Sequence, residues 1–319
     1  MENVRKIPSV AVLLSTYNGE RYIKDQIGSI LSQKDVGVVV VARDDGSTDG
    51  TLAVMRSIDD ERLIVLEGQN VGCTNSFSTL VEYCCSYLPK MQYFAFADQD
   101  DYWEPEKLSV GVSKISSMNG ASPNLYFCNM MVTDQNLNRI CLLRDYMLDI
   151  RKGNILLGGH AAGCTMVFNR KAMVLYAAHQ PTACHSYHDY WLLLICKYFG
   201  TVYYDEKPHI RYRQHNANLL GAHRYISYRE CWKNRLANWI SSPQEAYARQ
   251  ETVSDFLLSF DGDLSAEDKD ILELYRNYRE RLANRVILIC HKEFVPVNHA
   301  AWGLKVRLSQ AAKILLGKL

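Results

Sequence analysis

The sequence predicts an α/β protein in which a mostly parallel sheet is flanked by helices, followed by an α-helical C-terminal region. Its apolar runs, rich in β-branched residues, are solid rather than alternating, as expected for strands that are buried on both faces. Segments with helical periodicity separate these runs, and this alternation is typical of α/β domains. Strand signals vanish beyond about residue 220, which predicts one domain over 1–220 and a helical region over 221–319.

The first hundred residues supply strands and helices in alternation. Buried strands are predicted at residues 9–15, 37–42, 62–67 and 93–97. The first strand is followed by a helical stripe made of Ile23, Ile27, Ile30 and Leu31. The third strand is followed by a second stripe made of Phe77, Leu80, Val81, Cys84, Cys85 and Leu88.

The remaining residues continue the pattern less regularly. Strands are expected within 124–134 and 163–170, and "HDYWLLLICKYFG" predicts a helix that ends at Gly200. Residues 201–215 are predicted to form two strands separated at Pro208, and residues 266–294 one long helix.

The last segment, 302–319, carries an aliphatic stripe and four basic residues but no acidic one. Such a helix can lie on an anionic membrane surface. Two alternatives remain open, because the same helix could dock on the rest of the protein or engage a partner protein.

Composition excludes several classes of function. The net charge is +1, so the overall charge of the protein does not favour a nucleic-acid partner. The ten cysteines show no zinc-ligand spacing, and several lie in apolar segments, which indicates reduced thiols and a cytoplasmic location. The apolar start at 7–15 is interpreted as a core strand rather than a signal peptide, and no window is long and apolar enough to predict a membrane span.

Two acidic clusters follow two of the predicted strands. "RDDGSTD" comes after residues 37–42, and "DQDD" comes after residues 93–97. Ligands of open α/β sheets bind beyond the carboxyl ends of the strands. Carboxylates about 4 Å apart repel by roughly 4 kcal/mol at an effective dielectric of about 20. A divalent cation removes this repulsion, and oxygen ligands suit Mg²⁺ or Mn²⁺. The alternative is that these aspartates serve turns and helix caps.

An ordered series of motifs resembles the family 2 glycosyltransferases. The series comprises "STYNGERYIKDQIGSILSQ", "DDGSTDGT", "QNVG", "ADQDDYWEPEKL", "GCTMVF", "HDYWL" and "YRQHNANLLG", and it covers about residues 7 to 221. The resemblance implies the GT-A fold, with a Rossmann-like central sheet. It also implies inverting transfer of a sugar from a nucleoside diphosphate sugar. "DQDDYW", "HDYWL" and "YRQHNAN" are most similar to the bacterial rhamnosyltransferase branch, which builds cell-surface polysaccharide from dTDP-rhamnose.

The resemblance also implies roles in donor binding. Thr16, Tyr17 and Asp45 are expected to hold the nucleobase, and a carboxylate suits the N3–H of uracil or thymine. For Thr16 and Tyr17 the alternative is packing at a strand end. Asp98 is expected to contact the ribose or the metal, and Asp100 to ligate the metal. His215 is the candidate for a contact with the diphosphate or the metal.

Asp189, in "HSYHDYWL", matches the position of the general base in this family. His188 stands where Glu is more frequent, as it does in the rhamnosyltransferase branch. The alternative for Asp189 is a residue of the first helical turn, where the helix dipole favours an acid.

Four residues are weaker candidates for the acceptor site or the pocket. Asp101 could point to the acceptor or cap the helix that opens at "EPEKL", and Trp103 could stack on a sugar. His160 and His188 could line the pocket, and a structural role is the alternative for His160. The acceptor is expected to be a saccharide or a lipid-linked saccharide, met at the cytoplasmic face of the inner membrane.

Two other functions remain open. The same scaffold could bind sugar nucleotides or aid assembly without turnover, although the acidic positions argue for catalysis. A nucleotidyltransferase would also use acidic residues and Mg²⁺. Neither a glycine-rich, lysine-bearing phosphate loop nor a dinucleotide-binding glycine motif is present, which disfavours that alternative.

Overall fold

The computed structural model describes residues 7–145, 147–158, 161–182, 187–215, 243–294, 311–312 and 314–317. The backbone groups into two compact units. The first takes its described residues from 1–145, 161–180 and 199–222, and the second takes them from 146–160, 181–198 and 223–319. Segments that precede residue 200 thus pack with the C-terminal helices. The predicted boundary near residue 220 lies outside the described residues and stays a prediction.

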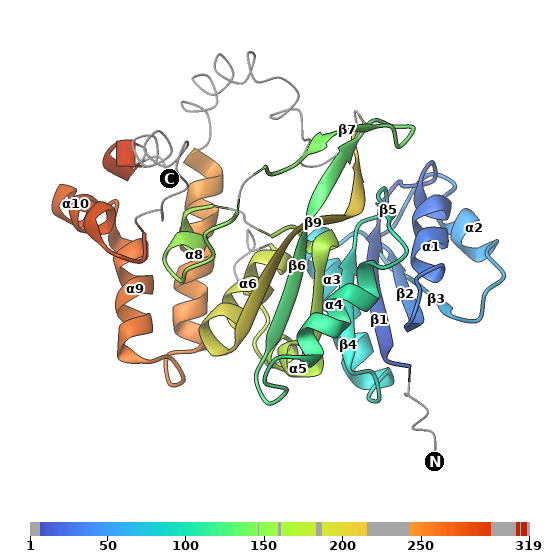
Figure 1. Ribbon diagram of the computed structural model, residues 1–319, viewed down its shortest axis with the longest axis horizontal. Coiled ribbons are helices and arrows are strands. Elements are labelled where there is room, and N and C mark those ends of the chain that lie inside the picture. Colours follow the sequence, from blue (N-terminus) through green and yellow to red (C-terminus); the bar gives the residue numbers. More distant parts are fainter. Residues whose placement is uncertain are drawn as a thin grey trace. The chain divides into compact units, whose positions relative to one another are not determined.

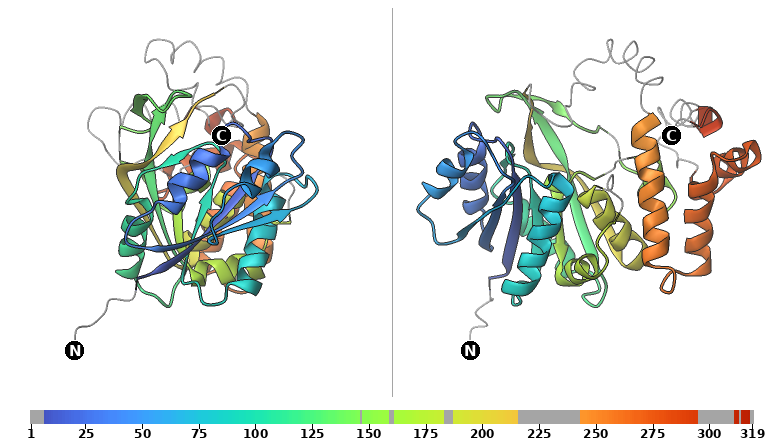
Figure 2. Two further views of the ribbon diagram at one scale, coloured as in Figure 1. Left: turned by 90° about the vertical axis from the view of Figure 1, so that its right-hand side faces the viewer. Right: turned by 180° about the vertical axis from the view of Figure 1, so that it is seen from behind.

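One mixed sheet forms the centre of the first unit (Figure 1, Figure 2). Its strands lie in the order β3-β2-β1-β4-β8-β6-β9-β5, and β7 pairs with β6. The strands are β1 (Ser9–Thr16), β2 (Gly37–Asp44), β3 (Leu63–Glu67), β4 (Tyr93–Ala97), β5 (Tyr102–Trp103), β6 (Asn124–Thr133), β7 (Arg139–Leu142), β8 (Met166–Asn169) and β9 (Thr201–Arg213).

The four strands predicted in the first hundred residues are confirmed and run parallel to one another. Thr16 of β1 lies beside Asp44 of β2, and Leu14 lies beside Ala97 of β4. The carboxyl ends of β1, β2 and β4 therefore meet at one edge of the sheet. The loops that carry the two acidic clusters leave from this edge.

The later strands depart from the sequence prediction in two ways. Residues 163–165 form a short 3-10 helix, η2 (Gly163–Thr165), and β8 then runs antiparallel to both β4 and β6. The expected break at Pro208 is wrong, because β9 continues through it and pairs with β6 on both sides of the proline. The pairing register of β6 and β9 shifts beside Asn129. This bulge accommodates the proline, which has no N–H to donate to a hydrogen bond between the strands.

Helices cover both faces of this sheet. The first face packs against α1 (Ile23–Leu31), α2 (Thr51–Arg56) and α4 (Lys107–Ser116), through one apolar core. The second face packs against α3 (Cys73–Tyr87) and α5 (Arg170–Ala178). Phe96 of β4 contacts Phe77 of α3 and Tyr176 of α5 there, with ring centroids 5.1 and 6.4 Å away.

The second unit contains η1 (Asn154–Leu157), α6 (His188–Phe199) up to Tyr198, α8 (Pro243–Ser259), α9 (Ala266–Asn277) and α10 (Leu282–Cys290). Its aromatic core joins α6 to α8, because the rings of Trp191 and Tyr198 contact Phe256.

The single helix predicted over 266–294 is wrong, since the chain is extended at Arg281 and separates α9 from α10. The break buries Tyr278, whose ring stacks on that of Tyr275. Among the described residues, no helix has both the length and the apolar character needed to cross a bilayer. The helix predicted over 302–319 lies mostly outside the described residues.

Candidate functional site

Asp45 follows β2, and polar contacts surround its carboxylate. Its side chain is buried, and its Oδ1 accepts hydrogen bonds from the Arg43 guanidinium and from the backbone N–H of Val71 at 3.1 Å. Its Oδ2 accepts from the N–H of Gly72 at 3.0 Å. A carboxylate has about four lone-pair positions, so these three contacts orient it and leave one position on Oδ2 for a ligand.

Arg43 connects three parts of the chain around this carboxylate. Its guanidinium also donates to Ser76 Oγ on α3 at 3.1 Å and to the backbone oxygen of Gln69 at 3.0 Å. The side chain is 7% exposed, so the charge of Asp45 is balanced inside the protein. Arg43 was not predicted from the sequence, although a basic residue at the end of so apolar a strand was a usable signal.

Asp44 has a different role from its neighbour. Its carboxylate accepts from the N–H of Ser47 at 3.0 Å and from Ser47 Oγ at 2.5 Å, which closes the turn after β2. Gly46, in that turn, has φ +78°, and a Cβ there would meet the backbone nitrogen of Asn70 at 2.8 Å. Only glycine fits this turn without strain.

Gln99, between Asp98 and Asp100, joins the "DQDD" loop to the end of β1. Its Oε1 accepts from Thr16 Oγ1 at 2.6 Å and from the N–H of Tyr17 at 2.8 Å. Its Nε2 donates to the backbone oxygen of Tyr17 at 3.1 Å. Thr16 is 1% exposed, whereas Tyr17 is 46% exposed. The site therefore places Tyr17 within reach of a ligand and uses Thr16 to anchor the acidic loop.

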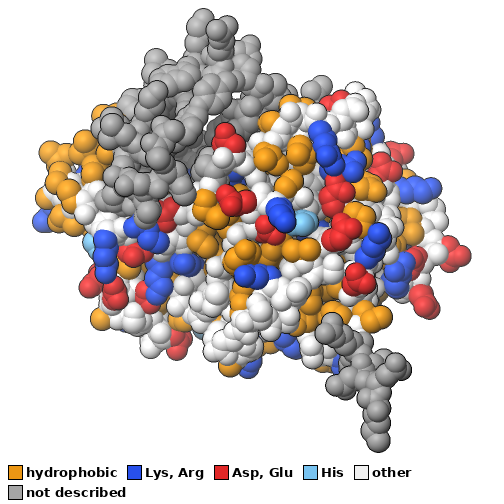
Figure 3. Space-filling model, in the orientation of Figure 1, with side chains coloured by type: hydrophobic (Ala, Val, Ile, Leu, Met, Phe, Trp, Pro, Cys, Tyr) orange, Lys and Arg blue, Asp and Glu red, His pale blue; other side chains and the backbone are white. Residues whose placement is uncertain are grey.

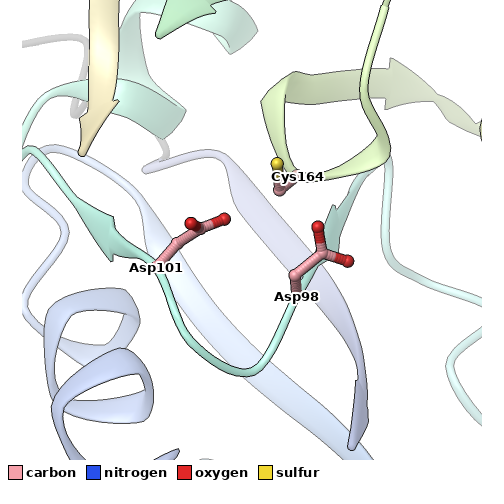
Figure 4. Close-up of side chains that lie close together, drawn as sticks. All are labelled: Asp98, Asp101 and Cys164. Atoms are coloured by element: carbon pink, nitrogen blue, oxygen red, sulfur yellow. The ribbon is translucent and has the colours of Figure 1, made fainter. Parts of the chain in front are cut away.

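The aspartates that follow β4 separate into two groups. Asp98 and Asp101 point toward one another and toward Cys164 of η2, with ligand atoms within 4.8 Å (Figure 4). Asp101 is completely buried, and the N–H of Arg213 donates to its Oδ1 at 3.3 Å. Burial, followed by the charges of Asp100 and Asp98, raises the pKa of Asp101 well above its usual value. Burial likewise raises the pKa of the Cys164 thiol, which favours the neutral thiol over the thiolate.

Asp100 pairs instead with His215, which lies just beyond β9. The two side chains are 14% and 11% exposed, and Asp100 Oδ2 lies 2.9 Å from His215 Nε2. The ring of Tyr22 contacts that of His215 in a tilted arrangement, with the centroids 4.7 Å apart. A carboxylate oxygen and an imidazole nitrogen that converge in this way are suitable ligands for Mn²⁺ or Mg²⁺.

Arg213 holds the backbone of the acidic loop in place. Its Nε donates to the backbone oxygen of Asp100 at 2.9 Å, and its Nη1 donates to that of Gln135 at 2.9 Å. Arg213 is 3% exposed, and Arg211 pairs with Glu104 at 2.8 Å. Both guanidinium groups are therefore already engaged by the protein.

In the second unit, Asp189 occupies the first turn of α6 and is partly exposed. Its Oδ1 accepts from the N–H of Tyr190 at 2.7 Å. The chain that leads to this helix is anchored on α8, because Thr182 donates to the carboxylate of Asp255 through its N–H and its Oγ1, each at 2.6 Å. The C-terminal helices thus support the segment that carries Asp189.

A family model described as "Glycosyl transferase family 2" matches residues 11–174, just over half of the chain. This protein belongs to glycosyl transferase family 2. The matched region contains both acidic clusters, the Gln99 anchor and the strands that position them.

One relative of this family 2 member is the dTDP-rhamnosyl transferase RfbG of Shigella flexneri. The two are 27% identical over 231 residues, which are 69% of this chain and 77% of the relative. This relative supports the resemblance to the rhamnosyltransferase branch.

Two solved structures share the fold. Residues 1–349 of TarS of S. aureus, in complex with UDP-GlcNAc, superpose with a TM-score of 0.52 at 13% identity, covering 97% of this chain and 91% of that fragment. The mannosyltransferase PcManGT of Pyrobaculum calidifontis, in complex with GDP-Man and Mn²⁺, superposes with a TM-score of 0.50 at 16% identity, covering 99% of this chain and 89% of that one. The GT-A fold implied by the sequence is confirmed.

The structure restricts several of the weaker predictions for this family 2 member. Trp103 is 1% exposed, so a sugar could stack on it only if the core opened. Asp101 is not the cap of α4, which begins without a side-chain cap; its carboxyl binds the backbone of β9 instead. His188 is buried, and burial lowers its pKa to about 4, which keeps the imidazole neutral. His160 lies outside the described residues.

Replacing Arg43 by Met should weaken donor binding and destabilise the fold. Removing one partner of a buried ion pair costs about 3–5 kcal/mol, because the remaining charge stays buried. The Asp45 carboxylate would also lose the contact that orients it. The matched control is Arg56→Met, because the pair of Arg56 with Glu67 is 60% and 57% exposed. Urea unfolding and a donor titration check both effects, and equal destabilisation by the two variants would contradict the prediction.

The buried Lys107 predicts how the stability of the fold depends on pH. It is completely buried, with Nζ over the Trp103 ring, and burial lowers the pKa of its ammonium to about 8. The pKa of an unfolded lysine is about 10.4, so between these values only the unfolded chain keeps the proton. Stability should then rise with pH through this window, by up to about 1.4 kcal/mol per unit from this group.

Lys107→Met should remove that contribution. We expect urea unfolding between about pH 8 and 10 to show a smaller gain with pH for this variant than for the wild type. Lys171→Met, at an exposed position of α5, should keep the wild-type slope. Identical slopes in all three proteins would show that Lys107 is not the group responsible.

Proposed function

We propose that this family 2 glycosyltransferase moves L-rhamnose from dTDP-rhamnose to a hydroxyl of a glycan or lipid-linked saccharide, in the synthesis of cell-surface polysaccharide. The observation that carries the choice of sugar is the similarity to the dTDP-rhamnosyl transferase RfbG over 69% of this chain. Neighbours in complex with UDP-GlcNAc and GDP-Man support the wider class of nucleotide-sugar donors.

In this proposal Asp45 recognises the nucleobase. The carboxylate has an acceptor position left on Oδ2 after its contacts with Arg43, Val71 and Gly72. The N3–H of thymine or uracil is a donor that fits this position, and Tyr17 is exposed beside the same strand ends. The carboxylate therefore favours thymine or uracil over adenine and cytosine, because the Watson–Crick edges of the latter two bases present a ring acceptor at the equivalent place.

Asp98, Asp100 and His215 are the residues that would hold Mg²⁺ or Mn²⁺. The contact of 2.9 Å between Asp100 and His215 supports this pair, whereas Asp98, from the same loop, points toward Asp101 and Cys164 and would have to turn to join them. When bound, the cation would supply positive charge to the leaving diphosphate. Gln99 and Arg213 keep the loop in one conformation through contacts with β1 and with the backbone of Asp100.

Asp189 would act as the general base. Its carboxylate takes the proton from the acceptor hydroxyl, whose oxygen forms a bond to the anomeric carbon of the sugar. The bond from that carbon to the diphosphate oxygen breaks on the opposite side, and the nucleoside diphosphate leaves with the electron pair. One displacement inverts the anomeric configuration. Asp189 lies in the first turn of α6.

The test is a thermal-shift series with Mn²⁺ and one donor at a time, namely dTDP-rhamnose, UDP-glucose or GDP-mannose. A ligand at about 100 times its Kd stabilises the folded state by about 2.7 kcal/mol, so selective binding is visible as a raised Tm. We expect dTDP-rhamnose to give the largest shift. Stronger stabilisation by UDP- or GDP-sugars would overturn the choice of rhamnose.

Release of the leaving group distinguishes the reaction classes. With donor and a saccharide acceptor, we expect free dTDP in the same amount as the glycosylated product. Pyrophosphate release would instead indicate a nucleotidyltransferase, and tight donor binding with no release would indicate a binding protein.

A further inference from the structure

Helix α10 presents an apolar face to solvent. Leu282, Val286 and Ile287 are 66%, 49% and 52% exposed. Ala283 and Cys290 are also exposed, and the spacing of these five residues places them along one side of the helix. A helix that packed only within its own protein would turn this side inward. On α10 only Leu288 is buried.

Two further exposed leucines lie near α10. Arg285 of α10 donates to the backbone oxygen of Leu315 at 2.8 Å and to that of Arg279 at 3.0 Å. Leu315 and Leu316 are 41% and 52% exposed. Figure 3 shows hydrophobic side chains gathered over α10, at the left edge of the view. We call the exposed residues Leu282, Ala283, Val286, Ile287, Cys290, Leu315 and Leu316 the α10 patch.

The charge of this part of the sequence is strongly asymmetric. Residues 281–319 contain seven Lys and Arg and one acidic residue, a net charge of +6. The whole chain carries +1, so residues 1–280 carry −5. Arg281, immediately before α10, is exposed. A basic segment beside exposed aliphatic side chains fits a surface that is negatively charged outside and apolar beneath.

We propose that the α10 patch binds the surface of an anionic lipid bilayer. Its aliphatic side chains enter the boundary between headgroups and acyl chains, and Arg281, immediately before the helix, contacts lipid phosphates. Nine residues of helix span only about 14 Å, so α10 lies in the interface and does not cross it. A second copy of the chain fits less well, because it would bring two segments of charge +6 together. The proposal does not depend on the donor or the acceptor.

The experiment measures binding of the full-length chain to vesicles without nucleotide sugar. We expect the protein to sediment with vesicles of phosphatidylcholine and phosphatidylglycerol and to stay in solution with phosphatidylcholine alone. Val286→Glu should lower the partition coefficient at least tenfold. Leu258→Glu is the matched control, since Leu258 is 79% exposed on α8, and it should bind as the wild type does. Arg281→Gln should weaken binding by up to about fivefold at low salt, the effect of one basic residue near a charged membrane.

Three results would overturn the proposal. The first is the absence of binding to the anionic vesicles, and the second is equal binding by the Val286→Glu and Leu258→Glu variants. The third is a wild-type dimer, seen by light scattering, that Val286→Glu dissociates, because the patch would then be a subunit interface. Circular dichroism establishes that each variant is folded, and Ile287→Ser replaces Val286→Glu if that variant is not. Because no donor is present, failure here leaves the proposed transfer reaction intact.

Discussion

Asp189→Asn is expected to lower the rate of sugar transfer by about 10²–10⁴-fold, the usual contribution of a general base. The amide keeps the shape of the carboxylate but cannot take the proton from the acceptor hydroxyl. Donor affinity should stay within about twofold of the wild type, because the proposed donor contacts come from other loops. The measurement is product formation at saturating donor and acceptor, together with a donor titration.

The alternative role of Asp189 is to stabilise the start of α6, and a control separates the two roles. Glu267 is an acidic residue in the first turn of α9, and its side chain is 73% exposed. Glu267→Gln and Asp189→Asn should each cost only about 0.3–1 kcal/mol of stability through the helix dipole. Only Asp189→Asn should affect turnover. If the two variants transfer sugar equally well, Asp189 is not the base.

Asp100→Asn is expected to have the second large effect, a loss of about 10²–10³-fold in transfer, comparable with the removal of one group that stabilises charge in a transition state. The carboxylate faces His215 at 2.9 Å, and an amide oxygen without charge is a poorer ligand for a divalent cation. Mn²⁺ titration followed by calorimetry should show weaker binding. His215→Asn should weaken Mn²⁺ binding in the same way.

The control for this pair is Asp261→Asn, since the Asp261 side chain is 77% exposed and forms only a surface ion pair with Lys269. That variant should keep wild-type Mn²⁺ affinity and activity. Unchanged Mn²⁺ binding by Asp100→Asn would show that the cation is held elsewhere, with the buried group of Asp98, Asp101 and Cys164 as the next arrangement to test.

The donor residues illustrate how far sequence reasoning reaches in this protein. The acidic clusters that contain Asp45 and Asp100 were predicted from their places after apolar strands, and the roles of these two residues from the resemblance to the family. The structure puts the ends of these strands beside one another. Arg43 and Gln99 were missed, because their importance comes from partners that are distant in the chain. Gln99 contacts Thr16 across 83 positions, and Arg43 contacts Ser76 across 33.

The later strands show the same limit for the fold. Proline normally ends or interrupts a strand, so a break at Pro208 was the natural prediction. Pairing of β9 with β6 overrides this local preference. A shift in register accommodates Pro208, which has no N–H to donate to the neighbouring strand. The break between α9 and α10 has no proline or glycine to announce it, and it follows from the burial of Tyr275 and Tyr278.

What the sequence by itself determined is the alternation of strands and helices, the parallel start of the sheet and the family of the chain. These depend on apolar periodicity and on ordered motifs, which are local properties of the chain. Only the tertiary structure decided that Asp100 pairs with His215, that Asp101 is buried under β9 and that Arg213 holds the acidic loop. These contacts join residues more than a hundred positions apart, and the free energy that selects them comes from burial and charge balance in the assembled core.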